Sequence, residues 1–327
     1  MSGELVSVVA PAYDEADLIA TFVQRTLAAL EGEQAELVVV DDGSRDGTGD
    51  LLDDLAAREP RLRVVHLSRN FGHQAALTAG LEHARGEAVV MIDADLQDPP
   101  EVIPRMLQEW RRGVDVVYAV RTQRPGESRF KLRTAHWFYR LFDALTDVHM
   151  EPDAGDFRLL SRRALTALLA MPERSRFLRG MTAWVGFTQI GIPYERDRRS
   201  AGHTKYTLTR MLRFSIDAIS SFSHAPLRLA TYLGFVLAAI AFLAMPVIVG
   251  LRLAGAYQSG FATITLIVLL LGGIQLIAIG ILGEYLGRIY DEVKQRPLYV
   301  VRDEVETAAP AQPPPGPVKV SDERVGQ

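Results

Sequence analysis

Cysteine is absent from the 327-residue sequence, which excludes disulfide bonds, thiolate metal sites and cysteine nucleophiles. An excess of positive charge is absent too: the net charge is −4, which argues against a nucleic-acid partner. A secretory signal peptide is also missing, because the apolar run 6–10 is too short and acidic residues follow it. We therefore expect the water-soluble part of the chain to lie in the cytoplasm.

Charged residues are absent from two long stretches, Leu229 to Leu251 and Leu253 to Gly283. Each exceeds the ~20 residues that a helix needs to cross a bilayer, although a buried helix of a soluble protein can have the same composition. Basic residues flank the pair on both sides: Arg210, Arg213, Arg228, Arg288, Lys294, Arg296 and Arg302. By the positive-inside rule, we predict an inner (plasma) membrane protein with two spans, both flanks in the cytoplasm and the hairpin tip outside.

Glycine-rich nucleotide signatures are also missing, since no GxGxxG follows the first strand and no GxxxxGK[ST] occurs. The N-terminal part instead alternates β-branched runs with helical patterns. The predicted strands cover 5–10, 36–40, 62–67, 88–92 and 114–120, and the predicted helices cover 16–30, 48–57, 74–85 and 101–111. This alternation predicts an α/β domain with a Rossmann-like, open and mainly parallel sheet.

An acidic cluster follows the fourth predicted strand, with carboxylates at Asp93, Asp95 and Asp98. An apolar run that breaks into carboxylates is typical of a buried strand that ends at the ligand-binding edge of an α/β sheet. Carboxylates two residues apart can bind Mg²⁺ or Mn²⁺, which in turn neutralises a diphosphate. The alternative is a solvated acidic turn, but the second acidic pair at 41–42 favours a binding site.

Two other strand ends carry residues that suit a nucleoside. Tyr13 and Glu15 follow the first strand, and Asp42 follows the second. An aromatic ring can stack on a base, and carboxylates can accept from base N–H groups or ribose hydroxyls. The alternative for each segment is a turn with a helix cap, because Asp46, Thr48 and nearby glycines are typical of such turns.

Four segments, taken in order, resemble the family 2 glycosyltransferases of GT-A fold: SVVAPAYDE (7–15), VDDGS (40–44), NFGHQAA (70–76) and DADLQDPPE (93–101). Within that family the pattern is similar to the polyprenyl-phosphate group, which includes dolichol-phosphate mannose synthases and bactoprenol glucosyltransferases. The resemblance continues through GDFRLL (155–160) and RSAGHTKY (199–206) and covers about residues 5 to 300. Asp14 and His203 depart from the usual residues.

The resemblance implies a role for each of these segments. The nucleotide-sugar pocket would be lined by Pro11, Tyr13, Glu15, Asp42 and Asp93. A divalent metal, Mg²⁺ or Mn²⁺, would be held by Asp95 and Gln97, which makes Asp95 essential for catalysis. Members of the family invert the anomeric centre in a single displacement.

The acceptor implied by the resemblance is a polyprenyl phosphate, such as undecaprenyl phosphate, in the membrane. Basic and aromatic residues cluster at 121–145 and basic residues at 196–213, a composition that suits an anionic membrane surface or a solvated face. By charge and resemblance, the candidates for the acceptor phosphate are Arg121, Arg133 and Lys205. Such a phosphate is already ionised and needs no general base. Asp156 is the catalytic candidate as a base or an orienting group, unless it only braces the backbone or pairs with Arg158.

These interpretations give four parts: a GT-A domain at 1–205, an amphipathic juxtamembrane helix at 206–226, a two-helix anchor at 227–287 and a cytoplasmic tail at 288–327, disordered from about 307. The predicted reaction moves one sugar, favoured as glucose or a related hexose from its UDP derivative, to polyprenyl phosphate for export and cell-envelope glycosylation. A GDP-mannose-dependent synthase, a processive polysaccharide synthase, a membrane scaffold and a channel are the alternatives. A homo-oligomer is expected, because Gln258, Gln275 and the Gly272-Gly273 pair could pack between subunits.

Overall fold

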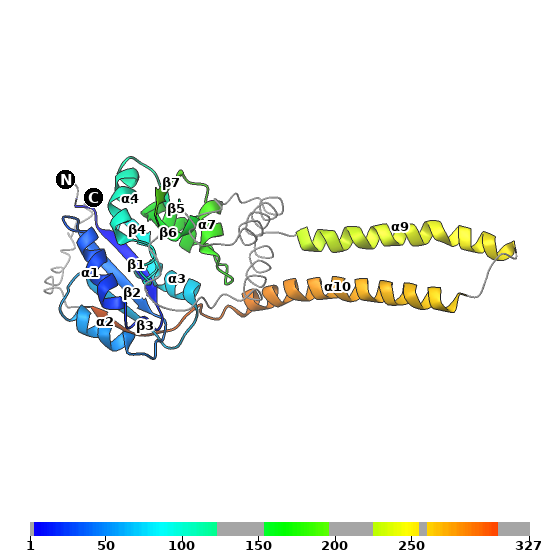
Figure 1. Cartoon of the computed structure of the whole chain (residues 1–327), viewed down its shortest axis with the longest axis horizontal. Coiled ribbons are helices and arrows are strands. Elements are labelled where there is room, and N and C mark those ends of the chain that lie inside the picture. Colours follow the sequence, from blue (N-terminus) through cyan, green and yellow to red (C-terminus); the bar gives the residue numbers. More distant parts are fainter. Residues whose placement is uncertain (1–2, 123–153, 196–224, 255–259, 307–327) are drawn as a thin grey trace, which may run out of the picture.

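The structure is a computed structural model that describes residues 3–122, 154–195, 225–254 and 260–306 (Figure 1). The N-terminal half alternates strands and helices as predicted. Its elements are β1 (Val6–Ala12), α1 (Ile19–Ala29), β2 (Ala35–Asp41), α2 (Thr48–Ala56), β3 (Leu62–Leu67), α3 (His73–His83), β4 (Ala88–Met91), η1 (Pro100–Val102), α4 (Ile103–Arg111) and β5 (Val116–Arg121). The remaining elements are β6 (Ala154–Ser161), α6 (Arg162–Leu169), α7 (Leu178–Trp184), β7 (Gln189–Tyr194), α9 (Ala225–Leu253), α10 (Phe261–Lys294) and β8 (Val301–Glu306).

The strands form one sheet in the order β7-β5-β6-β4-β1-β2-β3-β8. Strands β1 to β5 and β7 run in one direction, whereas β6 and β8 are antiparallel to their neighbours. The α/β class with a mainly parallel sheet is therefore confirmed. Because β1, β2 and β4 are adjacent and parallel, the segments that follow them meet at one edge, where α/β sheets bind ligands.

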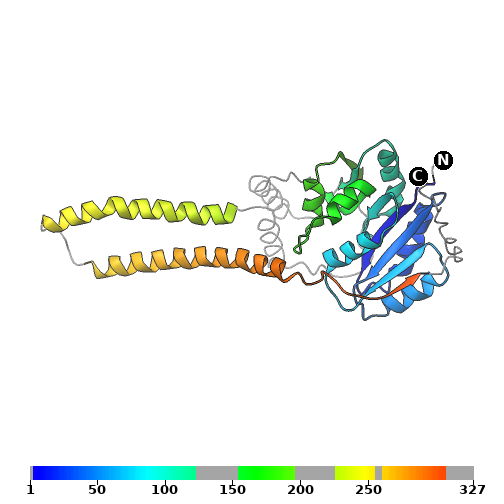
Figure 2. The same ribbon diagram turned by 180° about the vertical axis from the view of Figure 1, so that it is seen from behind.

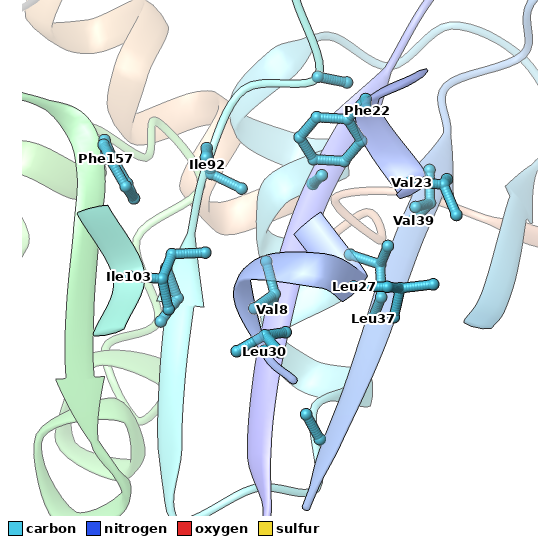
Figure 3. Packing of buried hydrophobic residues seen from close by; sticks show 14 of the residues in the cluster. Val8, Phe22, Val23, Leu27, Leu30, Leu37, Val39, Ile92, Ile103 and Phe157 are labelled. Carbon is cyan, nitrogen blue, oxygen red and sulfur yellow. The ribbon is translucent and has the colours of Figure 1, made fainter. Parts of the chain in front are cut away.

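Alternate residues of the central strands fill two separate cores, one on each face of the sheet. Val8 of β1 packs with α1, α2 and α4, and Figure 3 shows it among Phe22, Leu27 and Ile103. Val9 points the other way and packs with α3, α6 and α7. All residues of β1 and β2 are buried, as expected for strands covered on both faces.

The C-terminal strand β8 was not predicted from the sequence. Helix α10 continues past the proposed boundary at 288 to Lys294, and 301–306 then pairs antiparallel with β3 at the edge of the sheet. Charged contacts hold this strand: Arg63 lies 3.4 Å from Glu306, and Arg85 makes two hydrogen bonds to the same carboxylate. The part expected to be disordered, from about 307, lies outside the described residues.

Removing β8 is expected to destabilise the sheet domain. A chain that stops before Leu298 loses the packing of Tyr299, Val301 and Val305 on the two cores and exposes the edge of β3. We expect a loss of about 2–4 kcal/mol in unfolding free energy, or a fall of roughly 5–15 °C in Tm. The control is a chain that stops after Glu306. Equal melting temperatures for the two truncations would show that β8 adds no stability.

Helices α9 and α10 lie side by side and extend away from the sheet, as both views show (Figures 1 and 2). The apolar windows Pro226–Leu251 and Leu270–Lys294 have mean hydropathies of 2.5 and 1.6, and none of their residues is buried within the described structure. By length and composition, both helices are candidate membrane spans. The predicted juxtamembrane helix at 206–226 lies almost wholly outside the described residues.

Candidate active site

The loops after β1 and β2 are tied together by side-chain caps. The backbone N–H of Asp14 donates to Ser44 Oγ at 3.0 Å, and that of Glu15 donates to Thr48 Oγ1 at 2.9 Å. Tyr13, between the strand and these bonds, keeps 43% of its surface exposed. Pro11 is buried within β1. The hydrogen bonds therefore hold the two loops together beside Tyr13, whose side chain is partly exposed.

Asp42 performs a local structural task that the sequence did not reveal. Its two carboxylate oxygens accept from the backbone N–H groups of Phe71, at 2.7 Å, and Gly72, at 2.9 Å. Burial raises the pKa of Asp42, and these two bonds only partly offset that rise. Asp41 contacts a different group: its Oδ2 lies 3.0 Å from Nδ1 of the buried His66 ring. Asp42 thus fixes the turn that begins α3. Its contact with a nucleoside stays a prediction.

The turn after β4 holds the predicted metal ligands. The side-chain amide N–H of Gln97 donates to Asp95 Oδ2 at 2.6 Å, and its backbone N–H donates to Oδ1 at 3.1 Å. Leu96 between them has a φ of +57°, a conformation that is rare for a bulky residue and typical of functional turns. The residues fit Mg²⁺ or Mn²⁺ chemically, because such ions take oxygen ligands from one or two protein groups and complete their shell with substrate phosphates and water.

Asp93 lies two residues before Asp95, just beyond the end of β4 at Met91. Its Oδ1 is buried without a hydrogen-bond partner among the described residues, and burial raises the pKa of this carboxyl to about 6. The imidazole of His73 opposes that rise, since its Nε2 lies 3.5 Å from Asp93 Oδ1. A buried acceptor without a donor at a binding edge suits a ligand hydroxyl, which agrees with the predicted place of Asp93 near the ribose.

Arg121, a predicted acceptor ligand, reaches the site from the end of β5. Its Nε donates to Tyr194 Oη at 3.2 Å, and the Tyr194 hydroxyl in turn donates to Asp98 Oδ1. Burial and the neighbouring Asp98 raise the pKa of Tyr194, so the hydroxyl stays protonated. This chain of bonds joins Arg121 to the acidic turn after β4. The other two candidates, Arg133 and Lys205, lie outside the described residues.

Asp156 lies in β6, the antiparallel neighbour of β4, and is held by Arg179 of α7. The guanidinium donates from Nε to Oδ1 at 2.6 Å and from Nη2 to Oδ2 at 3.0 Å, and His73 Nε2 lies 3.5 Å from the same Oδ2. Burial alone would raise the pKa of Asp156, but Arg179 and His73 hold it well below its usual range. A carboxylate so strongly stabilised is a poor proton acceptor, so this geometry favours the orienting role over the base.

The predicted alternative partner of Asp156, Arg158, is engaged elsewhere. Its guanidinium donates to Thr182 Oγ1 and, at 2.8 Å, to the carbonyl oxygen of Gly155. Complete burial lowers the pKa of Arg158 to about 10. Arg158 therefore braces the backbone beside Asp156, whereas the direct ion pair comes from Arg179.

Three residues of this cluster were not assigned from the sequence: His73, Arg179 and Tyr194. His73 lies within the segment 70–76 that resembles the family, which was a usable signal. Arg179 and Tyr194 carry no motif, and only the packing of α7 and β7 brings them to the edge. The site residues predicted at 11–15, 42, 93–97, 121 and 156 nevertheless all lie at or near this edge of the sheet.

A mainly parallel sheet with an Asp-x-Asp turn after its fourth strand, beside a half-exposed tyrosine after its first, defines the class of GT-A glycosyltransferases. The chain belongs to glycosyl transferase family 2, whose family model matches residues 7–169. Full-length relatives bear this out. The chain is 46% identical over 299 residues to the uncharacterized glycosyltransferase YkcC of Bacillus subtilis (strain 168), with 90% of this chain and 93% of YkcC covered.

Two further similarities were found. The chain is 40% identical over 300 residues to the prophage bactoprenol glucosyl transferase homolog of Escherichia coli (strain K12), which covers 91% of this chain and 98% of that protein. Among solved structures, it is similar to glucosyl-3-phosphoglycerate synthase of Mycobacterium tuberculosis in complex with Mn²⁺, UDP and glucosyl-3-phosphoglycerate. That match has 24% identity and a TM-score of 0.45 and covers 66% of this chain and 78% of the synthase. The predicted family is confirmed.

Proposed function

We propose that this glycosyltransferase moves one hexose, from UDP-glucose or a related nucleotide-sugar, to polyprenyl phosphate at the cytoplasmic face of the membrane. The lipid-linked sugar would then serve export and cell-envelope glycosylation. One observation carries the proposal: the similarity to a bactoprenol glucosyl transferase homolog extends over 91% of the chain and so includes the candidate spans as well as the sheet domain.

The donor half of the proposed reaction uses the corner formed by the loops after β1, β2 and β4. Tyr13 stacks on the base, and Asp93 accepts from a ribose hydroxyl with its unpartnered oxygen. Asp95 and Gln97 would hold Mg²⁺ or Mn²⁺. When bound, the ion stabilises the negative charge that develops on the departing diphosphate.

The acceptor half needs orientation more than proton removal. A lipid monophosphate carries about −1.5 charge near pH 7 and is a nucleophile as it stands. The described cations at the edge, Arg121 and Arg179, can attract such a phosphate, and Asp156 fixes the position of Arg179. Holding the phosphate oxygen in line with the anomeric carbon then supplies much of the rate, and one displacement inverts that carbon.

Replacing Arg121 by Ala is expected to weaken acceptor use selectively. Loss of a charge-assisted hydrogen bond costs about 1.5–3 kcal/mol, or roughly 10- to 100-fold in kcat/KM for the lipid, while the KM of the nucleotide-sugar stays unchanged. The same outcome is predicted for Arg133 and Lys205. Arg105→Ala, on the exposed side of α4, is the control. A rise in donor KM alone would assign Arg121 to the diphosphate instead.

The proposed topology places the sheet domain and the C-terminus on the cytoplasmic side. It is supported by β8, which follows α10 yet pairs with β3, so that the chain returns to the sheet after the second helix. We expect a reporter fused after Gln327 to be cytoplasmic and one inserted at Ser259 to be external. Reporters on the same side would contradict two spans. The homo-oligomer stays a prediction.

The identity of the sugar and nucleotide is tested by a donor panel. The purified full-length protein is incubated with undecaprenyl phosphate and one donor per reaction: UDP-glucose, UDP-galactose or GDP-mannose. The mass of the lipid product is then measured by mass spectrometry. We expect one hexose added, fastest from a UDP donor. A preference for GDP-mannose would establish the mannose synthase alternative, and a polymer would establish the processive one.

A further inference from the structure

His73 occupies a bridging position that no motif assigns. It is the first residue of α3, and the turn before it is locked by the bonds from Phe71 and Gly72 to Asp42. From there, His73 Nε2 lies 3.5 Å from Asp93 Oδ1 and equally 3.5 Å from Asp156 Oδ2. Asp93 follows β4 and Asp156 lies in β6, and the two carboxylates belong to the proposed donor and acceptor halves of the site.

The groups around the imidazole favour its charged form. Asp93 after β4, Asp156 in β6 and Asp42 after β2 act on it with negative charge, and Arg179 in α7 acts with positive charge. Burial lowers the pKa of His73, but Asp156 and Asp93 outweigh burial and raise it above the ordinary value. The positive charge is therefore present below the raised pKa and is lost as the pH rises through it.

The His73 ring also offsets the negative charge that surrounds Asp93. Its Oδ1 has no hydrogen bond among the described residues, and Asp95, Asp98 and Asp156 all repel it. Arg179 directs two of its guanidinium nitrogens at Asp156. Among the described residues, the His73 ring lies 3.5 Å from both carboxylates.

We propose that His73, as an imidazolium, is a positioning residue for sugar transfer: it couples Asp93 on the donor side to Asp156 on the acceptor side and so keeps both carboxylates in place. The inference rests on the proposed transfer reaction. It assigns His73 no proton transfer, because the acceptor phosphate needs none. Its contribution is electrostatic, and it should therefore depend on the charge of the ring and not only on its shape.

The test compares the wild type with His73→Gln and His73→Ala in the full-length protein, with nucleotide-sugar and undecaprenyl phosphate as substrates. We expect kcat to fall about 10- to 100-fold in both variants near pH 6, with the donor KM within about threefold of the wild type. The ratio of wild-type to His73→Gln kcat is then followed from pH 5.5 to 9, since titrations of substrate and other residues cancel in that ratio. The ratio should decline as the pH rises through the pKa of His73.

The control is His83→Gln at the other end of α3, where the ring contacts Ala79 and Glu304 and not the site. This variant should keep wild-type kcat at every pH. A wild-type to His73→Gln ratio that is close to one, or that is large but independent of pH, would overturn the electrostatic role.

A second measurement needs no turnover and separates this inference from the proposed function. The imidazole nitrogens of ¹⁵N-histidine-labelled full-length protein are titrated by NMR without substrate, and the His73 signal is assigned by its loss in His73→Gln. We expect the pKa of His73 above the ordinary ~6.5 and about one unit lower in Asp156→Asn. A His73 pKa near the ordinary value that stays the same in Asp156→Asn would refute the bridging role of His73. Absence of lipid product from the wild type would refute only the proposed reaction.

Discussion

Asp95→Ala is expected to lower sugar transfer on the order of 10³-fold, because the turn after β4 would lose the carboxylate that holds the divalent ion. Charge neutralisation by such an ion is worth several kcal/mol in the transition state, and each ~1.4 kcal/mol is tenfold in rate. The fold should survive, because the side chain of Asp95 is only partly buried and its partner, Gln97, lies in the same turn.

The same result should follow from removing the metal. Treatment of the wild type with EDTA should abolish transfer, and Mg²⁺ or Mn²⁺ should restore it, whereas Asp95→Ala should not respond to either ion. Asp54→Ala, at an exposed position of α2, is the matched control and should behave like the wild type. An unchanged Tm for Asp95→Ala confirms that the fold is intact. Full activity in EDTA would contradict the metal assignment.

Asp156→Asn is the second substitution with a large expected effect. It keeps the shape of the side chain but removes the charge that orients Arg179 and faces His73. We expect kcat to fall roughly 10²-fold with little change in the donor KM, because positioning errors of this kind are costly in transfer reactions. Since Asp156 stays ionised over the working range, its own titration should add no pH dependence to the loss between pH 6 and 9, and any dependence should follow the pKa of His73, which is lower in the variant than in the wild type. A general base would instead matter most at low pH, where the acceptor phosphate still carries a proton.

Stability gives an independent readout for the same variant. Arg179 would lose its ionic partner, which should cost about 1–3 kcal/mol of unfolding free energy, less than for a fully buried pair because Arg179 keeps solvent contact. The pKa of Asp156 is depressed in the folded state, so its stabilisation is present above the unfolded value of ~3.9 and is lost as the pH falls below it. Denaturant unfolding should therefore show a wild-type advantage at pH 7 that shrinks below about pH 4. An advantage that grows on acidification would contradict the ion pair.

Local sequence patterns predicted the elements and the acidic turn because those features depend on near neighbours. The apolar run at 88–92 becomes β4, and its abrupt end predicts that Asp93 and Asp95 lie at the edge of the sheet. The capped loops at 13–15 and 44–48 follow from short turn motifs in the same way. In each case the residues concerned are close in the chain or follow adjacent parallel strands.

Partnerships between distant segments could not be predicted. A pair between Asp156 and Arg158, two residues away on the same strand, was one of the alternatives that the sequence left open. The docking of α7 instead gives Asp156 Arg179 as its partner, and Arg158 donates to Thr182 and Gly155. The pairing of Arg85 with Glu306 joins residues 221 positions apart, and the charged segment 301–306 resembles a solvated tail until it meets β3. Such contacts depend on the assembled fold and carry no local signal.

The most direct test of the central claim is the phosphorus chemistry of the lipid product. Undecaprenyl phosphate and the preferred nucleotide-sugar are incubated with the full-length protein, and the purified lipid is examined by ³¹P NMR together with its mass. Transfer of the sugar alone predicts a single phosphodiester signal, one added hexose and release of the nucleoside diphosphate. A pair of diphosphate signals with release of the nucleoside monophosphate would mean that a sugar phosphate was transferred, and a lipid that gains no sugar would contradict the account altogether.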